Sequence, residues 1–440
     1  MRNVTVPAAN PAAPIPAANP AAPVPVAPAA SVPVPLPVVP PVPVPVSLPE
    51  SLPVPVVLAG ARGHGRWHLA NVRRLQHQGR VRLAGICELE PLTAGELAAS
   101  GFGPGESPEQ SADFGALLDL TGARTAIICT PIQTHTELAL AAAARGVHLL
   151  LEKPPAAGWT DYARMAEGVE RAGIACQVGF QSFGSHALPA IRELMTSGAI
   201  GNVTGFGAAG AWVRDDAYFR RAPWAGRRRI GTTDVVDGVL TNPLAHAVAT
   251  ALELACRGRA EEVVSIETEL FRAHAIEADD TSSVRITTAG GPRVTVAVTL
   301  CAERPGEPYV IVHGERGRIT FWYKQDRVLV QRAGRGPEET VHGRTDLLEN
   351  LLDHLEHGTP LLVPPASTGA FMRVVEAVRN APEPAPLPER AWETRHDGPD
   401  GGARRVVPGI DSLVAAGAES LGLFSELGAP WARVGEAAAS

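Results

Sequence analysis

The sequence predicts an α/β domain built on a parallel sheet, followed by an α+β domain that contains a large, mostly antiparallel open sheet. Three observations lead to this prediction. Residues 54–180 alternate short apolar runs with helical patterns, as right-handed βαβ units do. From about residue 201 the apolar runs lengthen and alternate with polar residues, as strands with one solvated face do. Residues 1–53 are dominated by Ala, Pro and Val and contain neither pattern.

Composition and charge limit the class of function. A chain of 440 residues with 45% hydrophobic and 19% charged residues can bury the cores of two domains. Its net charge of −7 at pH 7 predicts no nucleic-acid partner, because such binding needs a basic surface. The five cysteines lack metal-ligand spacing, which predicts buried thiols, a reducing compartment and no metal site. These properties fit a cytoplasmic enzyme that acts on small molecules.

Residues 1–53 are predicted to be a disordered tail. No charged residue falls between Arg2 and Glu50, but proline recurs throughout and deletes the amide donors that a membrane-spanning helix needs. The basic start and unbroken apolar stretch of a signal peptide are also missing. We therefore expect a partly polyproline-II tail and no membrane association. The remaining boundaries are placed at 54–180, 181–396 and 397–440, the last being a C-terminal tail with a short helix.

The elements expected in the two domains follow from the period of the apolar residues. In the first domain we expect strands at 54–59, 81–87, 126–130, 147–151 and 174–178, and helices at 64–78, 134–145 and 159–172. In the second we expect strands at 263–271, 282–288, 293–300 and 309–313, and helices at 240–256, 344–357 and 367–380. These three helices are expected to cover one face of the second sheet and to leave the other face open. A Gly-rich linker then leads to an amphipathic segment near 410–427.

A glycine-rich turn joins the first strand to the first helix. Gly60, Gly63 and Gly65 allow a tight turn and a close approach of the backbone, and the helix N-terminus adds free amides. With His64 they follow the spacing GxGxxG, although Arg62 replaces the second glycine. This predicts a dinucleotide-binding Rossmann domain. A purely structural turn is the alternative.

The end of the second strand bears on the choice of cofactor. Glu88 stands where a carboxylate accepts hydrogen bonds from the adenosine ribose and repels a 2′-phosphate, which favours NAD over NADP. Arg62 acts in the opposite direction, because its guanidinium could reach a 2′-phosphate. We therefore predict NAD as the cofactor, with NADP as the alternative.

Two further strand ends carry polar residues next to proline. Thr130, Pro131 and His135 follow one strand, and Glu152 and Lys153 follow the next and precede a proline. The carboxyl ends of parallel strands meet at one edge of the sheet, where ligands bind in open α/β folds. These residues therefore predict a ligand site at that edge.

With these motifs the sequence resembles the glucose–fructose oxidoreductase/inositol dehydrogenase/MocA (Gfo/Idh/MocA) family. The matching elements are residues 60–68, Glu88, Thr130, Pro131, His135, and residues 146–148, 152–154, 177–181, 198–203 and 280–284, with Gly314 and Gly317. The resemblance spans about residues 54–392. It implies an NAD(P)-dependent dehydrogenase or reductase that transfers hydride between the nicotinamide and a hydroxyl or keto carbon of a sugar, cyclitol or related polyol. It also implies that Gln181 and Lys153 lie at the cofactor.

The amino-acid composition supports a functional role for Lys153. Of the 39 basic residues only Lys153 and Lys324 are lysine, so a lysine between Glu152 and a proline indicates a role that arginine cannot fill. A lysine can lose its proton when it is partly buried, whereas a guanidinium stays charged. The resemblance places Lys153 between the nicotinamide and the substrate hydroxyl. A surface lysine at a strand end is the alternative.

Asn242 and His246 are the next catalytic candidates. The family usually has an Asp and a His four residues apart on one helix face, and here the pair is Asn242 and His246. His246 can take the proton of an alcohol as hydride leaves, whereas Asn242 can orient a hydroxyl but cannot accept its proton. Asp237, upstream, is the candidate for the missing carboxylate. A structural histidine is the alternative for His246.

The segment from Arg214 to Arg229 is dense in cations and aromatic residues. As a substrate clamp, Trp224 would stack on a sugar ring while arginines such as Arg214 and Arg228 grip a carboxylate or hydroxyls. A solvated or subunit-contact loop is the alternative. The arginine that the family usually has shortly after Gln181 is absent, so the resemblance implies no particular sugar.

Two rival functions share the same fold. One is a lyase-type or glycoside-cleaving enzyme that oxidises and then re-reduces its substrate without net redox change. The other is a non-catalytic dinucleotide and sugar sensor. A homodimer or homotetramer is expected from the resemblance and from the apolar residues on both faces of the predicted sheet at 263–313.

Overall fold

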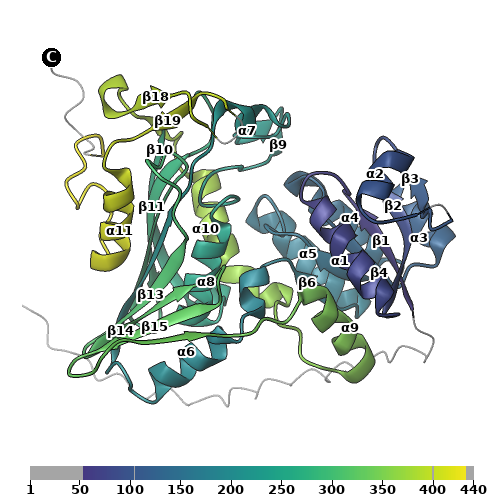
Figure 1. The fold of residues 1–440 in the computed structure, drawn as a ribbon, viewed down its shortest axis with the longest axis horizontal. Helices are drawn as coiled ribbons and strands as arrows, with labels where there is room; N and C mark the ends of the chain where they lie inside the picture. Colours follow the sequence, from purple (N-terminus) through teal and green to yellow (C-terminus); the bar gives the residue numbers. More distant parts are fainter. Residues whose placement is uncertain (1–52, 104, 399–400, 433–440) are drawn as a thin grey trace, which may run out of the picture. The chain divides into compact units, whose positions relative to one another are not determined.

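The first domain is a six-stranded parallel sheet with the strand order β3-β2-β1-β4-β5-β6 (Figure 1). The computed structural model describes residues 53–103, 105–398 and 401–432, so the tail predicted at 1–53 lies outside the described residues except for Pro53. The strands are β1 (Val54–Ala59), β2 (Val81–Cys87), β3 (Glu109–Ser111), β4 (Thr125–Ile128), β5 (His148–Leu151) and β6 (Cys176–Val178). The order is that of a Rossmann fold, as predicted.

The helices described in this domain are α1 (Gly65–His77), α2 (Ala94–Ala99), α3 (Phe114–Thr121), α4 (His135–Ala143) and α5 (Trp159–Ala172). Helix α5 has the predicted bounds and ends at Gly173, whose φ of +65° suits a left-handed C-cap. Helices α2 and α3 and strand β3 were not predicted. The two helices are short and start on side-chain caps, Thr93 and Asp113, so few apolar residues mark them.

The register of the parallel sheet brings the predicted ligand residues to one edge. Ala59, the last residue of β1, pairs with Cys87 of β2 on one side and with Ile128 of β4 on the other. Ile128 in turn pairs with Leu151 at the end of β5. The residues that follow these four strands therefore lie together at the carboxyl edge.

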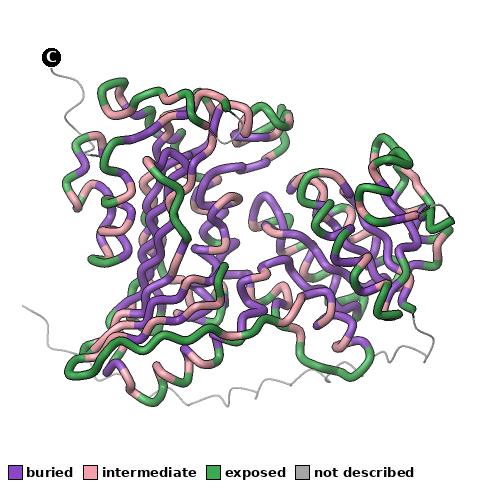
Figure 2. The backbone as a smooth tube through the Cα atoms, in the orientation of Figure 1, coloured by how far each residue is buried: buried purple, intermediate pink, exposed green. Residues whose placement is uncertain are grey.

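The second domain contains a nine-stranded mixed sheet with the order β16-β15-β14-β13-β7-β12-β11-β10-β17. The strands are β7 (Val203–Ala211), β10 (Val263–Arg272), β11 (Thr281–Thr288), β12 (Arg293–Thr299), β13 (Tyr309–Gly314), β14 (Gly317–Trp322), β15 (Arg327–Arg332), β16 (Glu338–Val341) and β17 (Ala385–Pro386). Among these described strands only the β7–β12 and β10–β17 pairs are parallel, so the predicted mostly antiparallel sheet is confirmed. Figure 2 shows that the central strands are buried along most of their length.

Further helices and strands are described in this part of the chain. They are α6 (Ala187–Thr196), α7 (Asp216–Arg220), β8 (Arg229–Ile230), β9 (Thr233–Asp234), α8 (Ala245–Cys256), α9 (Leu347–His357), α10 (Gly369–Asn380), β18 (Glu393–Arg395), β19 (Arg404–Val406) and α11 (Ile410–Ser420). Helix α8 packs against β7, β12 and β13, and α10 packs against α8 and β10. No helix in the described part of the chain is long and apolar enough to cross a membrane.

The central strand β7 escaped prediction because it carries small residues. A side chain at Gly210 would stand 2.7 Å from the Leu244 side chain beside α8, and one at Gly207 would stand 1.9 Å from the carbonyl oxygen of Ala418 in α11. Other segments of the chain pack so closely against both faces of β7 that only the hydrogen atom of a glycine fits at these two positions. A strand of this composition lacks the bulky apolar residues that mark a strand in a sequence.

Two expectations about this sheet were wrong. Helix α9, predicted to cover it, packs instead against β5 and β6 of the first domain, where Arg80 pairs with Asp353 at 2.6 Å. The face predicted to be open is covered by α11 and the residues after it (Figure 1). A second core forms there, which contains Phe271, Ile311, Val407, Ile410, Val414, Ala418 and Phe424. The amphipathic segment of the predicted tail therefore belongs to the body of this domain.

Candidate active site at the carboxyl edge of the parallel sheet

The glycine-rich turn after β1 has the close packing that a dinucleotide site requires. Gly60 has φ +83°, and a Cβ atom there would stand 2.4 Å from the carbonyl oxygen of Cys129. A Cβ atom at Gly65, the first residue of α1, would stand 1.9 Å from the carbonyl oxygen of Gly60. No side chain caps the N-terminus of α1, where His64 is the N-cap residue. The turn and the helix terminus therefore fit a pyrophosphate.

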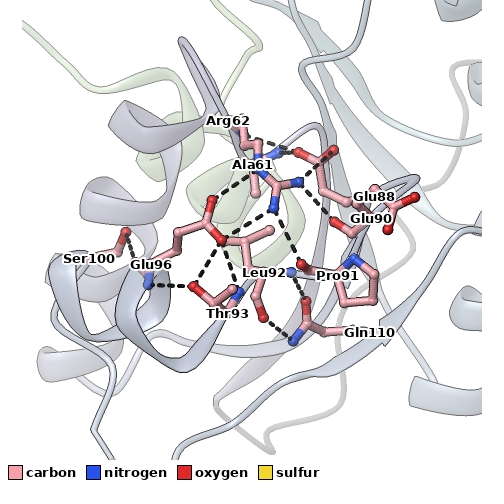
Figure 3. Close-up of polar contacts among 10 residues, drawn as sticks. All are labelled: Ala61, Arg62, Glu88, Glu90, Pro91, Leu92, Thr93, Glu96, Ser100 and Gln110. Atoms are coloured by element: carbon pink, nitrogen blue, oxygen red, sulfur yellow. Dashed lines mark hydrogen bonds and ion pairs between the residues drawn. The ribbon is translucent and has the colours of Figure 1, made fainter.

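The carboxylate of Glu88 closes this turn from the end of β2. Its Oε1 atom accepts hydrogen bonds from the backbone amides of Ala61 at 2.6 Å and Arg62 at 3.1 Å (Figure 3). This holds the carboxylate beside the turn, at the position from which a ribose is bound in this fold. The guanidinium of Arg62 contacts Glu96 in α2 and the carbonyl oxygens of Glu90 and Pro91 in the loop before that helix.

Glu152, which follows β5, is the buried centre of a second cluster. Its Oε1 atom lies 3.0 Å from Nε2 of His68, 3.5 Å from Nε2 of His64 and 2.9 Å from Nε2 of Gln181. Burial raises the pKa of the Glu152 carboxyl, but hydrogen bonds from His64 and His68 outweigh it and hold the pKa well below its usual value. Glu152 therefore carries a negative charge directly before Lys153.

Lys153, Asn242 and Asp237 form one chain of hydrogen bonds. The Nζ atom of Lys153 donates to Oδ1 of Asn242 at 2.8 Å and to the Asn242 carbonyl at 3.1 Å. The Nδ2 atom of Asn242 donates to Oδ1 of Asp237 at 2.6 Å, and the amide of Gly226 donates to Oδ2 of Asp237 at 2.7 Å. The amide group of Asn242 thus holds Lys153 at one end and Asp237 at the other.

Asn242 and His246 do not share a helix face, contrary to the prediction. Helix α8 begins at Ala245, so Asn242 lies in the turn before the helix, and only His246 lies on the helix. Asn242 was also expected to orient a substrate hydroxyl, whereas in the structure it orients Lys153. Asp237, proposed as the missing carboxylate, is buried and reaches Lys153 through Asn242.

Burial and neighbouring charges shift the pKa values of Lys153 and His246, the two candidate proton carriers. Burial lowers the pKa of Lys153, against the opposing charges of Glu152 and Asp237. Burial and the nearby Lys153 lower the pKa of His246 to about 3, so its imidazole is neutral at physiological pH. The Nδ1 atom of His246 lies 3.2 Å from Oγ of Ser182, to which the hydroxyl of Thr250 donates at 2.9 Å.

Aromatic side chains fix the orientation of the His246 ring. Phe180 meets it edge-on, with ring centroids 5.5 Å apart, and Tyr323 stacks on it at 6.3 Å. Together with Ser182, these contacts come from both sides of the domain boundary predicted at 180/181. Sequence reasoning missed Ser182 and Tyr323, because neither lies in a recognisable motif.

The cation-rich segment divides into a part near this site and a part away from it. Arg221 lies 3.6 Å from Asp237, and its guanidinium covers the rings of Tyr218 at 3.7 Å and Trp224 at 4.7 Å. The guanidinium of Arg214 also contacts this group and lies 4.9 Å from the centroid of the Tyr218 ring. Arg221 was not singled out from the sequence, because nothing in the pattern separates it from its neighbouring arginines.

Arg228 does not join that group. Its guanidinium donates to the carbonyl oxygens of Val378, Arg379, Ala381 and Pro382, at 2.7–3.0 Å. These carbonyls lie at the C-terminus of α10, where a cation also interacts favourably with the helix dipole. The structure therefore places Arg228 as a helix cap and not as a substrate ligand.

His135 ties together the two loops that follow β4 and β5. Its ring nitrogens lie 2.8 Å from the carbonyl oxygen of Thr130 and 2.9 Å from that of Pro154, and the ring is buried. Pro131 is the N-cap of the turn that leads into α4. These residues shape the edge of the site, and His135 does so with both of its ring nitrogens already engaged.

Two clusters among the described residues have donor atoms suited to a metal ion. They are His64, His68 and Glu152, and the buried group of His274, Asp280 and Cys301. In the first, hydrogen bonds to the carboxylate account for the arrangement, and Gln181 shares the same oxygen. In the second, Asp280 also accepts the backbone amides of Ala273 and His274, which ties a loop to the sheet.

Comparison with known proteins covers both domains. The profile of the oxidoreductase family with an NAD-binding Rossmann fold, GFO_IDH_MocA, matches residues 54–180, and that of the GFO/IDH/MocA C-terminal domain matches residues 189–320. Levoglucosan dehydrogenase of Pseudarthrobacter phenanthrenivorans is 28% identical over 36% of this chain and 39% of its own length. A 4-carboxy-2-hydroxymuconate-6-semialdehyde dehydrogenase of Sphingobium sp. is 30% identical over 28% of this chain and 37% of its own. The chain thus matches less than half the length of these curated relatives.

Among solved structures, the WlbA dehydrogenase of Bordetella pertussis in complex with NADH and UDP-GlcNAcA has a similar fold. Its TM-score is 0.59 with 20% sequence identity, over 74% of this chain and 95% of that one. At this level of identity the similarity concerns the fold alone.

Proposed function

The chain belongs to the Gfo/Idh/MocA family of NAD-binding oxidoreductases, and on that premise we propose that it is a dehydrogenase acting on a hydroxyl carbon of a sugar, cyclitol or related polyol. The observation that carries the proposal is the hydrogen-bonded chain Lys153–Asn242–Asp237. Burial and the charge of Lys153 lower the pKa of the nearby His246, which favours its neutral imidazole. A neutral imidazole can accept the proton of an alcohol, and an ammonium group can stabilise the negative charge that develops on the oxygen.

The proposed roles follow from charge. In the oxidation direction the substrate carbon loses a hydride and its oxygen loses a proton, so that a carbonyl forms. NAD, when bound, supplies the hydride acceptor. His246 accepts the proton through its ring, while Lys153 stabilises the negative charge that develops on the oxygen. Asn242 and Asp237 are positioning residues that keep the Lys153 ammonium in one place.

The residues proposed to hold NAD are those that line the edge of the parallel sheet. The turn at Gly60–Gly65 and the N-terminus of α1 fit the pyrophosphate, and Glu88 fits the ribose. The carboxylate of Glu152 contacts His64, His68 and Gln181, and these contacts order the part of the site next to Lys153. We propose NAD rather than NADP as the preferred cofactor.

An anionic sugar is the substrate class that the surroundings favour. Arg221 shares Asp237 with Asn242 and stacks on Trp224, and Arg214 lies across Tyr218. Arginines bind carboxylates, and aromatic rings stack on the faces of sugars. WlbA of Bordetella pertussis, a structural neighbour, was solved in complex with the sugar nucleotide UDP-GlcNAcA.

A substrate screen tests the proposal. Sugars, sugar acids, UDP-sugars and inositols are offered with NAD⁺ and with NADP⁺, and the absorbance of the reduced nicotinamide is recorded. We expect reduction of NAD⁺ with at least one anionic sugar. Product formation without accumulation of NADH would favour a redox-neutral lyase or glycoside-cleaving enzyme. Binding of NAD⁺ and sugar without any transfer of label from reduced cofactor would favour a sensor.

We also propose a cytoplasmic homodimer or homotetramer. The five cysteines are free thiols, in keeping with a reducing compartment. The sheet face that was predicted to be open was one reason to expect an oligomer. It is covered by α11, so a subunit interface has to use another surface. Light scattering at micromolar concentration gives the mass, and a monomer would contradict the proposal.

A further inference from the structure

The guanidinium of Arg62 is held by acceptors at the end of β2, in the loop that follows it and in α2 (Figure 3). Its Nε atom donates to Glu96 Oε1 at 3.0 Å and one Nη atom to Glu96 Oε2 at 3.2 Å, which is a two-point contact. The carbonyl oxygens of Glu90 and Pro91 accept from the guanidinium at 2.8 and 3.3 Å. Glu88 lies 3.7 Å away. Every nitrogen of the guanidinium therefore has an acceptor.

Glu96 is itself held in place by the start of α2. It is the third residue of α2 and completes a capping box with Thr93, and its Oε2 atom accepts from the amide and the hydroxyl of Thr93 at 2.9 and 3.0 Å. These hydrogen bonds, first that from the Thr93 amide and then that from Arg62, lower the pKa of Glu96 to about 2. The contacts with Thr93 therefore hold the Glu96 carboxylate in position independently of Arg62, and the carboxylate is charged.

This arrangement decides what Arg62 can do. An arginine close to the adenosine ribose is the group that accommodates a 2′-phosphate in NADP-binding Rossmann domains. Here Glu96 and Glu88 together offset its single positive charge, and the carbonyls occupy its remaining donors. A 2′-phosphate would have to displace Glu96 from the guanidinium and accept the repulsion of both carboxylates.

We propose that Glu96 is the specificity-determining residue that withholds Arg62 from a 2′-phosphate and so makes the site selective for NAD(H). This rests on the proposed function, because it assumes that a dinucleotide binds at the glycine-rich turn. At the ribose itself, Glu88 is the carboxylate expected to favour NAD over NADP. Glu96 explains how the chain keeps that selectivity although an arginine replaces a glycine of the motif.

Coenzyme binding to Glu96→Gln tests the proposal. Glutamine is also compatible with a capping box, so the fold of α2 is kept while the charge is removed. Dissociation constants for NAD⁺, NADP⁺, 5′-AMP and 2′,5′-ADP are measured by calorimetry at low salt. We expect the preference for NAD⁺ over NADP⁺ to fall by about tenfold or more, since a freed Arg62 can make a charge-assisted contact to phosphate. The same change should appear between 5′-AMP and 2′,5′-ADP.

A double-mutant cycle with Arg62→Leu assigns the effect to this pair. The gain in NADP⁺ affinity should vanish when Glu96→Gln is combined with Arg62→Leu. Glu106→Gln is the matched control, because Glu106 pairs with Arg73 at 2.6 Å on the same domain and has no contact with Arg62 among the described residues. Thr93→Ala removes the cap but keeps the Glu96 charge, and it should leave the coenzyme preference within about twofold of wild type.

The outcomes separate this inference from the proposed function. A folded Glu96→Gln protein with the wild-type coenzyme preference would overturn the inference while NAD⁺ binding stands. A gain in NADP⁺ affinity that persists with Arg62→Leu would overturn it as well, because the repulsion of Glu96 alone would then explain the preference. A wild-type protein that binds neither coenzyme would overturn both the inference and the proposed function.

Discussion

Replacing Asn242 by aspartate puts two carboxylates within hydrogen-bond distance of each other. The Nδ2 atom of Asn242 donates to Oδ1 of Asp237 at 2.6 Å, and Asp237 is buried. Asn242→Asp exchanges that donor for an oxygen and keeps the acceptor that Lys153 uses. A hydrogen bond to a charged group contributes about 1.5–3 kcal/mol to stability. With about 2–4 °C per kcal/mol for a domain of this size, we expect Tm to fall by about 3–12 °C.

The loss should depend on pH. Repulsion raises the pKa of one carboxyl of such a pair in the folded protein above its value in the unfolded chain. The folded state then binds more protons than the unfolded state, so stability falls as pH rises through the interval between the two pKa values. The deficit relative to wild type is therefore expected to be complete at pH 8 and smaller at pH 5. Thermal unfolding followed by circular dichroism at both pH values measures it.

The exchange variant, which combines Asp237→Asn with Asn242→Asp, is the control. The amide introduced at position 237 can accept from the Gly226 backbone and donate to the carboxylate introduced at position 242. Each hydrogen bond of the pair then has a donor and an acceptor again. We expect this variant to recover most of the lost Tm, and activity to fall in Asn242→Asp and return in part. An Asn242→Asp protein that melts like wild type at pH 8, or an exchange variant no better than Asn242→Asp, would refute the reasoning.

Three more predictions concern stability. Arg228→Ala should lower Tm with unchanged coenzyme affinity, because it uncaps α10, whereas an effect on substrate KM alone would restore its predicted role as a substrate ligand. A chain that ends at Val406 should melt earlier and self-associate, because α11 no longer covers Phe271 and Ile311. Unchanged melting and gel-filtration behaviour would contradict this. Burial raises the pKa of Asp279 to about 6, above the unfolded value, so this group costs stability as pH rises from about 4 to 6, by up to about 3 kcal/mol. Urea unfolding should therefore show Asp279→Asn more stable than wild type at pH 7.5 but not at pH 4.5, and equal gains at both would refute that origin.

Sequence reasoning worked best where chemistry is local. The apolar strands of the parallel sheet and the glycine-rich turn could be predicted directly, because each is specified by residues adjacent in the sequence. Strand β7 could not be predicted in this way. Its glycines are required because Leu244 and Ala418, which are distant in the chain, pack closely against them. The cover of the outer sheet face by α11 is likewise a property of packing that no local period reveals.

The same distinction applies to the site. Lys153, Asn242 and Asp237 were singled out individually, but which atom holds which became visible only from the hydrogen bonds between them. His68 and Arg221 were missed because their partners, Glu152 and Asp237, are supplied by other segments. From the sequence, Arg62 could be proposed as a ligand of a 2′-phosphate, but no partner for it could be named. The structure shows that its partner is Glu96.

The central claim is that Lys153 and His246 carry the proton chemistry of a hydride transfer, and steady-state turnover with the best substrate of the screen tests it. Lys153→Arg and His246→Ala should each lower kcat by about a hundredfold or more, while the dissociation constant of NAD⁺ barely changes for His246→Ala. Lys324→Arg, the same substitution at the other lysine of the chain, should leave kcat within about twofold of wild type. An active wild-type protein whose turnover is unaffected by both Lys153→Arg and His246→Ala would contradict the assignment of this site.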